Sequence, residues 1–254
     1  MTAQRISVIN LLRDTFAVVG SIYPALLRIN YPHLIYFVVN TFGRYAMLNS
    51  LDITTHELDS ASIYWHIIYW FVAVPFFWGA TTFYTYRSLT GNQVTASDAL
   101  TQAKRRLLPL IVVCFLSVVL LILSVAGTMW FLRFFAFVGL IRLIIIYPGL
   151  YVSCRLIFSS YATVIDNYSV QDSLKSSWKL TKGLWWLVFQ SNLLILFVFF
   201  VPAVLLSGLI GSKWENLLGS QLLGNVLGLI AGLLMNVYLV LLYQRLRESA
   251  AATQ

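Results

Sequence analysis

The residues closest to catalytic chemistry in this sequence are His56, Glu57, Asp59 and His66. Imidazoles and carboxylates are metal ligands, and a zinc-binding helix typically carries two histidines four residues apart. No second histidine follows His56 at that spacing. We therefore interpret these residues as a polar loop and expect no metal site. The sequence also has no glycine-rich phosphate loop, no nucleophile elbow and no paired carboxylates in its apolar runs, so we expect no enzyme and no catalytic residue.

Aromatic side chains crowd the stretch 63–86 around Pro75. One interpretation is a stacking site for a quinone, a pigment or a haem, with His66 as ligand. The other is an aromatic belt at each membrane interface together with packing around a kinked helix. We favour the second interpretation and expect no resident cofactor.

Arg142 is the strongest candidate for binding an anionic group. It lies inside an apolar run, and an arginine at the membrane midplane costs roughly 2.5–3.5 kcal/mol unless it faces the bundle interior or a cavity. The amide side chains that could receive it are Gln190, Asn192, Asn225 and Asn236. The alternative is that the span begins later and Arg142 lies near the outer interface. Both readings stay open.

Cations and tryptophans also gather at two corners beside apolar runs. A lysine or arginine near an anionic leaflet contributes about 1 kcal/mol to membrane binding. We therefore assign the net charge of +8 to anionic lipid headgroups as partners, and not to nucleic acid. The candidate lipid- or anion-binding residues are Arg142, Lys104, Arg105, Arg106, Lys179, Lys182, Trp185 and Trp186.

A row of small residues recurs every four positions in the last apolar run: Ser220, Gly224, Gly228 and Gly232. Such a row lets a second helix approach closely. Packing within the chain is the default interpretation. A homodimer or a membrane-protein partner is the alternative.

The elements that carry these residues are long apolar segments. Hydrophobic residues make up 59% of the 254 residues and charged residues 10%. About 20 apolar residues in a helix cross a hydrocarbon core of ~30 Å. The sequence predicts an all-α integral membrane fold, a six-transmembrane-helix bundle in one polytopic domain, 1–254. The expected spans are 31–50, 63–86, 107–127, 131–157, 184–210 and 217–243, of which the first is the weakest.

Lysine and arginine counts predict the orientation. The N-terminal stretch, the segments 87–106 and 155–182, and the C-terminal tail are basic, whereas the first opposite loop carries Asp52, Glu57 and Asp59. We expect both termini and the two long basic loops in the cytoplasm, with the chain in a bacterial cytoplasmic-type membrane.

The two basic loops resemble each other. Thr95 corresponds to Ser169, and Asp98 corresponds to Asp172. In both pairs the second residue comes 74 positions after the first. A hydroxyl residue three positions before an acidic one is typical of a helix start. Each loop then predicts a basic amphipathic interfacial helix before the next span. The pattern suggests repeats of helical hairpins near 5–86, 95–160 and 169–245.

One stretch of the chain carries a family pattern. It comprises Tyr147-Pro148-Gly149-Leu150-Tyr151, Arg155, Asp172-Ser173-Leu174, Ser177-Trp178-Lys179-Leu180-Thr181-Lys182-Gly183 and Trp185-Trp186. It resembles the membrane domain that precedes some bacterial glycerophosphodiester phosphodiesterases, and related six-span inner-membrane proteins. The resemblance implies a six-helix membrane module. It implies no catalysis, because the catalytic residues of the fused enzymes belong to a separate soluble domain that this sequence does not contain.

The expected function is therefore non-enzymatic: a lipid-organising module, or an accessory or assembly subunit of a membrane complex. The alternative is a transporter or exporter of an amphiphilic or anionic solute. Arg142 and the polar residues of the last two spans would then line the path, and broken helices at Pro75, Pro148 and Pro202 favour it.

Overall fold

Long apolar runs fold as helices because a helix satisfies every backbone polar group within its own segment. The computed structural model describes residues 7–50, 66–134, 139–211 and 217–252. Within these ranges it leaves out the side chains of 44–50, 121–134, 139–147, 210–211 and 217–221. In the described ranges every regular element is helical. In chain order these are α1 (Val8–Ser50), η1 (Tyr69–Ala73), α3 (Val74–Leu89), α4 (Ala96–Arg105), α5 (Leu107–Phe134), α6 (Gly139–Leu156), α7 (Ser159–Ile165), α8 (Val170–Leu180), α9 (Trp185–Ile195), η2 (Leu196–Phe200), α10 (Val201–Gly211) and α11 (Leu217–Ala252).

Among the described residues, three helical segments are long and apolar enough to cross a membrane: His66–Leu89, Trp185–Leu209 and Leu222–Ala252. The predicted all-α class is confirmed for these residues, and the three segments are compatible with a membrane protein. The other three predicted spans are helical wherever the structure describes them, except for Ile157, which follows the end of α6. That they cross a bilayer stays a prediction.

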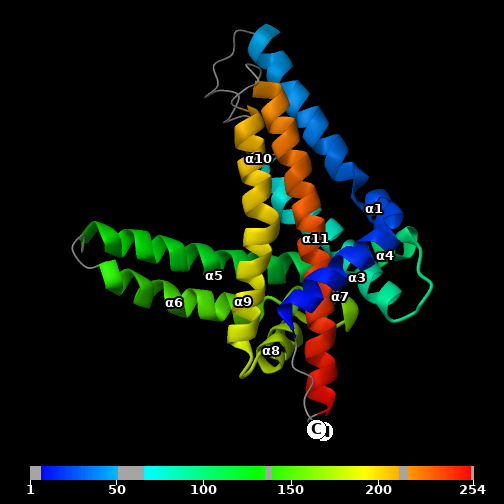
Figure 1. Ribbon diagram of the computed structural model, residues 1–254, viewed down its shortest axis with the longest axis vertical. Coiled ribbons are helices and arrows are strands. Elements are labelled where there is room, and N and C mark those ends of the chain that lie inside the picture. Colours follow the sequence, from blue (N-terminus) through cyan, green and yellow to red (C-terminus); the bar gives the residue numbers. More distant parts are fainter. Residues whose placement is uncertain (1–6, 51–65, 135–138, 212–216, 253–254) are drawn as a thin grey trace.

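Helix α11 forms the central column of the fold (Figure 1). It packs along α1, α3 and α10. Every side chain from Asn236 to Tyr243 is buried, so the helix is covered on all sides there. By contrast, only 11% of the apolar window in Trp185–Leu209 is buried inside the protein. Its outward side chains, such as Phe197 and Leu205, suit a lipid environment.

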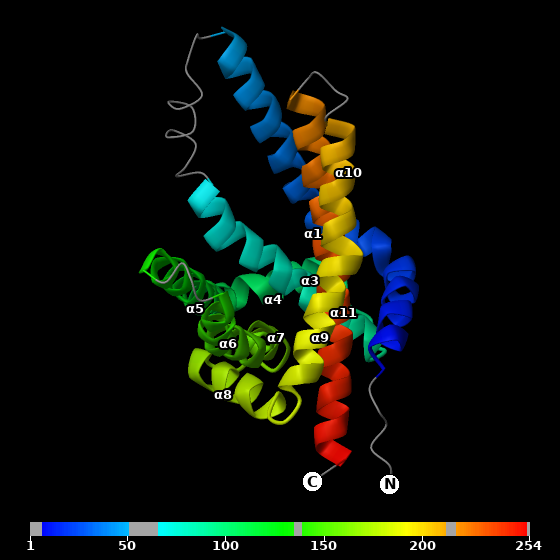
Figure 2. The same cartoon turned by 60° about the vertical axis from the view of Figure 1, so that its left-hand side comes forward.

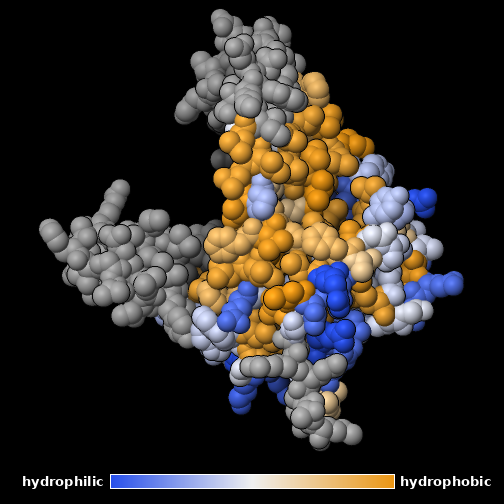
Figure 3. All heavy atoms as spheres, in the orientation of Figure 1, coloured by the Kyte–Doolittle hydropathy of each residue, from blue (hydrophilic) through white to orange (hydrophobic). Residues whose placement is uncertain are grey.

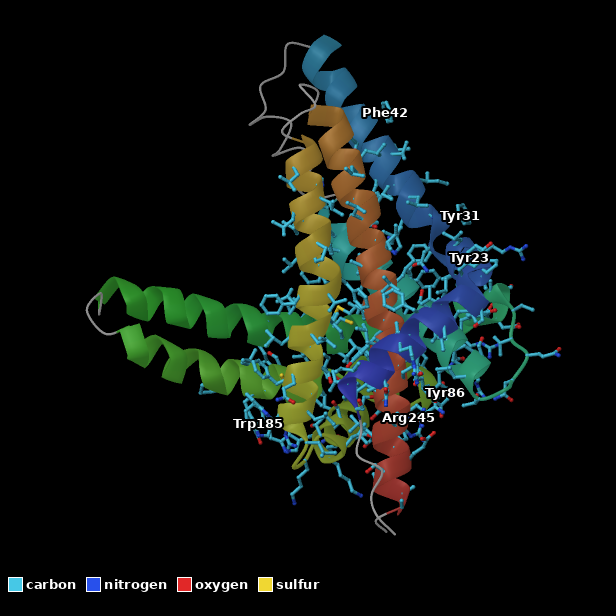
Figure 4. All side chains as sticks on the ribbon, viewed as in Figure 1. Tyr23, Tyr31, Phe42, Tyr86, Trp185 and Arg245 are labelled. Atoms are coloured by element: carbon cyan, nitrogen blue, oxygen red, sulfur yellow. The ribbon has the colours of Figure 1, made fainter. Side chains whose placement is uncertain are left out.

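Helix α1 runs without a break through Pro24 and Pro32. The predicted span 31–50 is therefore the second half of a longer helix that begins at Val8. The helix instead changes direction in the region of Tyr23 and Tyr31 (Figure 4). Proline removes one helical hydrogen bond and crowds the preceding turn, which bends a helix without ending it.

Helices α5 and α6 pack along each other and project sideways from the α9–α11 column (Figures 1 and 2). The first turn of α1 and the last turn of α11 lie at the same end of the molecule, the lower end in Figure 2. Hydrophilic side chains gather over the lower part and along the right-hand side of the described surface, whereas its upper part is mostly apolar (Figure 3). We call these hydrophilic parts, which include helices α4 and α8, the basic end.

Candidate functional site

Helices α4 and α8 begin where the sequence predicts. The Thr95 hydroxyl accepts a hydrogen bond from the Asp98 backbone N–H at 3.2 Å, and the Asp98 carboxylate accepts one from the Thr95 N–H at 3.0 Å. The Thr95 hydroxyl also donates to the same carboxylate at 2.7 Å. This bond first, and then the one from the Thr95 backbone N–H, lowers the pKa of the exposed Asp98 carboxyl. In α8 the Ser169 hydroxyl accepts from the Asp172 N–H at 3.2 Å. Both predicted helix starts are confirmed.

Each of these two helices buries a face of small side chains. Ala99 and Ala103 are fully buried in α4, and Ser173 and Ser177 are buried in α8. The two pairs occupy equivalent positions of the 74-residue offset, from 99 to 173 and from 103 to 177. Because residues four apart share one helix face, each helix lies flat on the bundle and turns its charged face outward.

The short helix α7 and the turn after it hold both helices. The Thr163 hydroxyl donates to the Ser173 hydroxyl at 2.8 Å, which fixes α8. On the other side, the Asn167 side-chain oxygen accepts from Gln102 at 2.6 Å and from Arg106 at 2.9 Å, which fixes α4. Asn167 has a φ of 59°, a left-handed conformation that asparagine tolerates better than most residues. The two basic helices are thus parts of one rigid block.

The predicted cations differ in their surroundings. Lys104, Arg105, Lys179 and Lys182 are exposed, and the described part of the chain offers none of them an ion-pair partner. Arg106 is half-buried and bound to Asn167, so its role is to hold α4 in place. The four exposed side chains are therefore the ones free to meet an anion.

The tryptophans lie beside this charged face. Trp186 is 54% exposed, and Trp185 packs edge-on against Tyr151 with ring centroids 5.6 Å apart. Trp185 lies at the start of α9, near the lower end of the molecule (Figure 4). Indole rings favour the membrane interface because one part is apolar and the N–H is polar.

Arg155 also belongs to the basic end, although the sequence does not single it out as a candidate site residue. It is 4% exposed, and its guanidinium carbon lies 4.5 Å from the centre of the Trp178 ring and 5.6 Å from that of Tyr151. The Ser177 hydroxyl donates to the Arg155 backbone oxygen at 2.7 Å, which ties α8 to the end of α6. Its Nε has no hydrogen-bond partner in the described structure. A buried cation without a carboxylate adds positive potential beneath the exposed lysines.

The remaining candidates are spread over other parts of the molecule. The structure does not describe the side chains of Arg142 and Ser220, nor the residues His56, Glu57 and Asp59. Within the described residues, no group of three histidine, cysteine or acidic side chains could hold a metal. Gln190 is exposed, and Asn192 lines a cavity of about 250 Å³ beside α6.

The three glycines of the small-residue row line a second cavity, together with Asn225 and Asn236. Of the three, Gly224 also packs against α10, because a Cβ there would lie 3.6 Å from the Ser207 side chain, an ordinary packing contact. A homodimer through this face stays a prediction.

Comparisons with known proteins add no family to these observations. No family model, no curated protein and no solved structure matches the chain.

Proposed function

We propose that this chain is a multi-pass, non-enzymatic membrane protein that binds anionic lipid headgroups at its basic end. The observation that carries the proposal is the placement of Lys104, Arg105, Lys179 and Lys182. These four cations are exposed and lack ion-pair partners in the described structure. They project from α4, from α8 and from the turn after α8, and the two helices are held by α7 and the turn that follows it. By this binding the protein organises lipid, or presents a lipid-coated surface to a membrane complex of which it is an accessory subunit.

Elementary electrostatics supports this function. Each cation near an anionic leaflet contributes about 1 kcal/mol, so the four together favour contact with anionic headgroups by about 4 kcal/mol. The helices are already fixed on the bundle by their buried small faces, so little conformational freedom is lost when a headgroup binds. The basic end would then face the cytoplasm of a bacterial cell, as the excess of lysine and arginine favours. Membership of the glycerophosphodiester phosphodiesterase membrane-domain family remains part of the same proposal.

The test is lipid retention by the purified chain, measured by native mass spectrometry after reconstitution in mixed anionic and zwitterionic bilayers. Reversal of all four charges (K104E, R105E, K179E, K182E) should abolish retention of the anionic lipid. The matched control exchanges the same residues without changing charge (K104R, R105K, K179R, K182R) and should retain it. Equal retention by the two variants, both inserted in the membrane, would overturn the proposal.

A second candidate function is transport of an amphiphilic or anionic solute. The observation that favours it is that Asn192 lines one open cavity of the bundle and that Asn225 and Asn236 line another. If the chain is a transporter, Arg142→Ala and Asn192→Ala should each stop the flux of a fluorescent fatty acid into proteoliposomes. Unchanged flux in both variants excludes this path.

A further inference from the structure

A cavity of about 330 Å³ lies between α1, the η1–α3 segment, η2 and α11. It is separate from the basic end, since none of the cations of the proposed headgroup site lines it. Aromatic side chains form much of its wall, among them Trp70 and Trp78. Its volume falls in the range of small-molecule sites, about 300–1,000 Å³. It suits one ring-sized headgroup better than a two-chain lipid.

Missing side chains on α11 create the hollow. A Cβ built on Gly228 or on Gly232 would meet nothing within 4 Å. These glycines therefore do not bring another helix close, which is the usual role of such a row in membranes. They leave space where any other residue would fill it.

Both π-helical turns of the described chain border this space. Tyr69 and Trp70 come from η1, and Phe200 comes from η2. Each turn ends two residues before a proline, Pro75 or Pro202, which cannot donate the helical hydrogen bond. A wide turn is less stable than regular helix and recurs at functional sites, where it re-aims side chains. Here both turns direct aromatic residues to one cavity.

The polar groups of the wall are few and uncharged. His33 Nδ1 hydrogen-bonds the Tyr69 hydroxyl, and Asn30 donates to Thr81 at 2.9 Å. Asn225 is half-buried and lines the cavity, and its side chain makes no hydrogen bond within the described residues. Its amide can therefore donate a hydrogen bond to a ligand in the cavity.

We propose that this cavity binds an uncharged, lipid-soluble molecule with a flat ring that carries carbonyl groups, the chemistry of an isoprenoid quinone. The aromatic wall stacks on the ring. The Asn225 amide donates to a carbonyl oxygen. The described residues of the wall include no cation, so a phosphate or carboxylate headgroup would lack a charged partner. This ligand differs from the anionic lipid of the proposed function, and either proposal can fail without the other.

The experiment titrates a short-tailed benzoquinone into the full chain in zwitterionic nanodiscs and follows tryptophan fluorescence, which a bound quinone quenches. Trp70 and Trp78 in the wall should give saturable quenching. Gly228→Leu should fill the cavity and weaken binding by at least about tenfold, equivalent to about 1.4 kcal/mol. Gly208→Leu is the matched control, because Gly208 is also open around its Cβ position but lies on the exposed surface of α10.

Asn225→Leu serves as the second variant and keeps the test decisive if Gly228→Leu fails to fold. This substitution should weaken the binding of the quinone and leave the binding of an aromatic hydrocarbon of similar size unchanged. Quenching that stays linear in the unmodified chain overturns the proposal. The proposal is also overturned if a folded Gly228→Leu or Asn225→Leu chain binds the quinone as tightly as the Gly208→Leu chain does. Displacement of the quinone by a fatty acid would overturn it as well.

Discussion

Arg247, near the end of α11, donates a hydrogen bond of 2.7 Å to the carboxylate of Asp166. Asp166 is the residue that caps the C-terminal end of α7. The same carboxylate accepts a second hydrogen bond, of 2.6 Å, from the Tyr243 hydroxyl. The Asp166 side chain is only 13% exposed. The pair therefore fastens the last helix to the block that carries both basic helices.

Asp166→Asn should lower the free energy of unfolding by about 2 kcal/mol, because two hydrogen bonds to a charged acceptor are weakened. The measurement is unfolding of the purified chain in SDS, followed by far-UV circular dichroism. Glu248→Gln is the control. Glu248 pairs with Arg245 at 3.8 Å on the exposed surface, and its loss should change stability by less than about 0.5 kcal/mol. Equal losses in the two variants would contradict the fastening role.

Asn167 combines a left-handed backbone with an acceptor for two side chains, and two substitutions separate these roles. Asn167→Gly keeps the conformation and removes the acceptor, which should cost about 1–2 kcal/mol. Asn167→Ala also removes the acceptor and adds backbone strain of about 1 kcal/mol. The same unfolding assay should rank the alanine variant below the glycine variant. The reverse order would show that the turn is not held left-handed.

Gly79 marks a close approach of α3 to its neighbours. A Cβ there would lie 2.6 Å from Leu110 Cδ1, and Leu110 is fully buried, so it has no free space to move into. Gly79→Ala should therefore destabilise the fold by about 1–3 kcal/mol through overpacking. Gly208→Ala, at an open position, should stabilise it by up to about 1 kcal/mol through helix propensity. Thermal melting in detergent should show shifts of opposite sign.

The pKa of the Asp98 carboxyl should lie below its ordinary value, since the Thr95 hydroxyl and the Thr95 backbone N–H both donate hydrogen bonds to its ionised form. A folded-state pKa below the unfolded one means that this cap stabilises α4 above the ordinary carboxyl pKa. The contribution is lost as the pH falls through the lowered value. Carbon-13 NMR of labelled aspartate can follow the titration. Thr95→Ala should move the Asp98 midpoint upward, and an unmoved midpoint would remove the stated cause.

The helices could be located from the sequence because hydropathy reports the solvent around a segment. The apolar run 184–210 coincides within one residue at each end with the helical segment from Trp185 to Gly211. Hydropathy does not report which helices touch. The sideways course of α5 and α6 and the unbroken α1 depend on tertiary packing, so the sequence did not reveal them.

The site divides in the same way. The exposed lysines could be found from charge and helix-start signals alone. The burial of Arg155 could not, because it depends on Trp178 of α8 packing over the guanidinium at the end of α6. The four-residue spacing of small residues singles out Gly228. This spacing does not tell whether a glycine brings two helices together or leaves a hollow. Only the open space around its Cβ position distinguishes the two.

The burial of α11 on all sides between Asn236 and Tyr243 has a consequence for biosynthesis. This helix follows all the others along the chain, yet Phe158 and Tyr161 of α7 and Val188 of α9 belong to the core around it. While the ribosome is still making α11, those earlier helices have no partner on their inner faces. The membrane-inserted intermediate must therefore stay loosely packed until the final column arrives. During this interval the inner faces of the earlier helices are the surface that an insertase or a chaperone can bind.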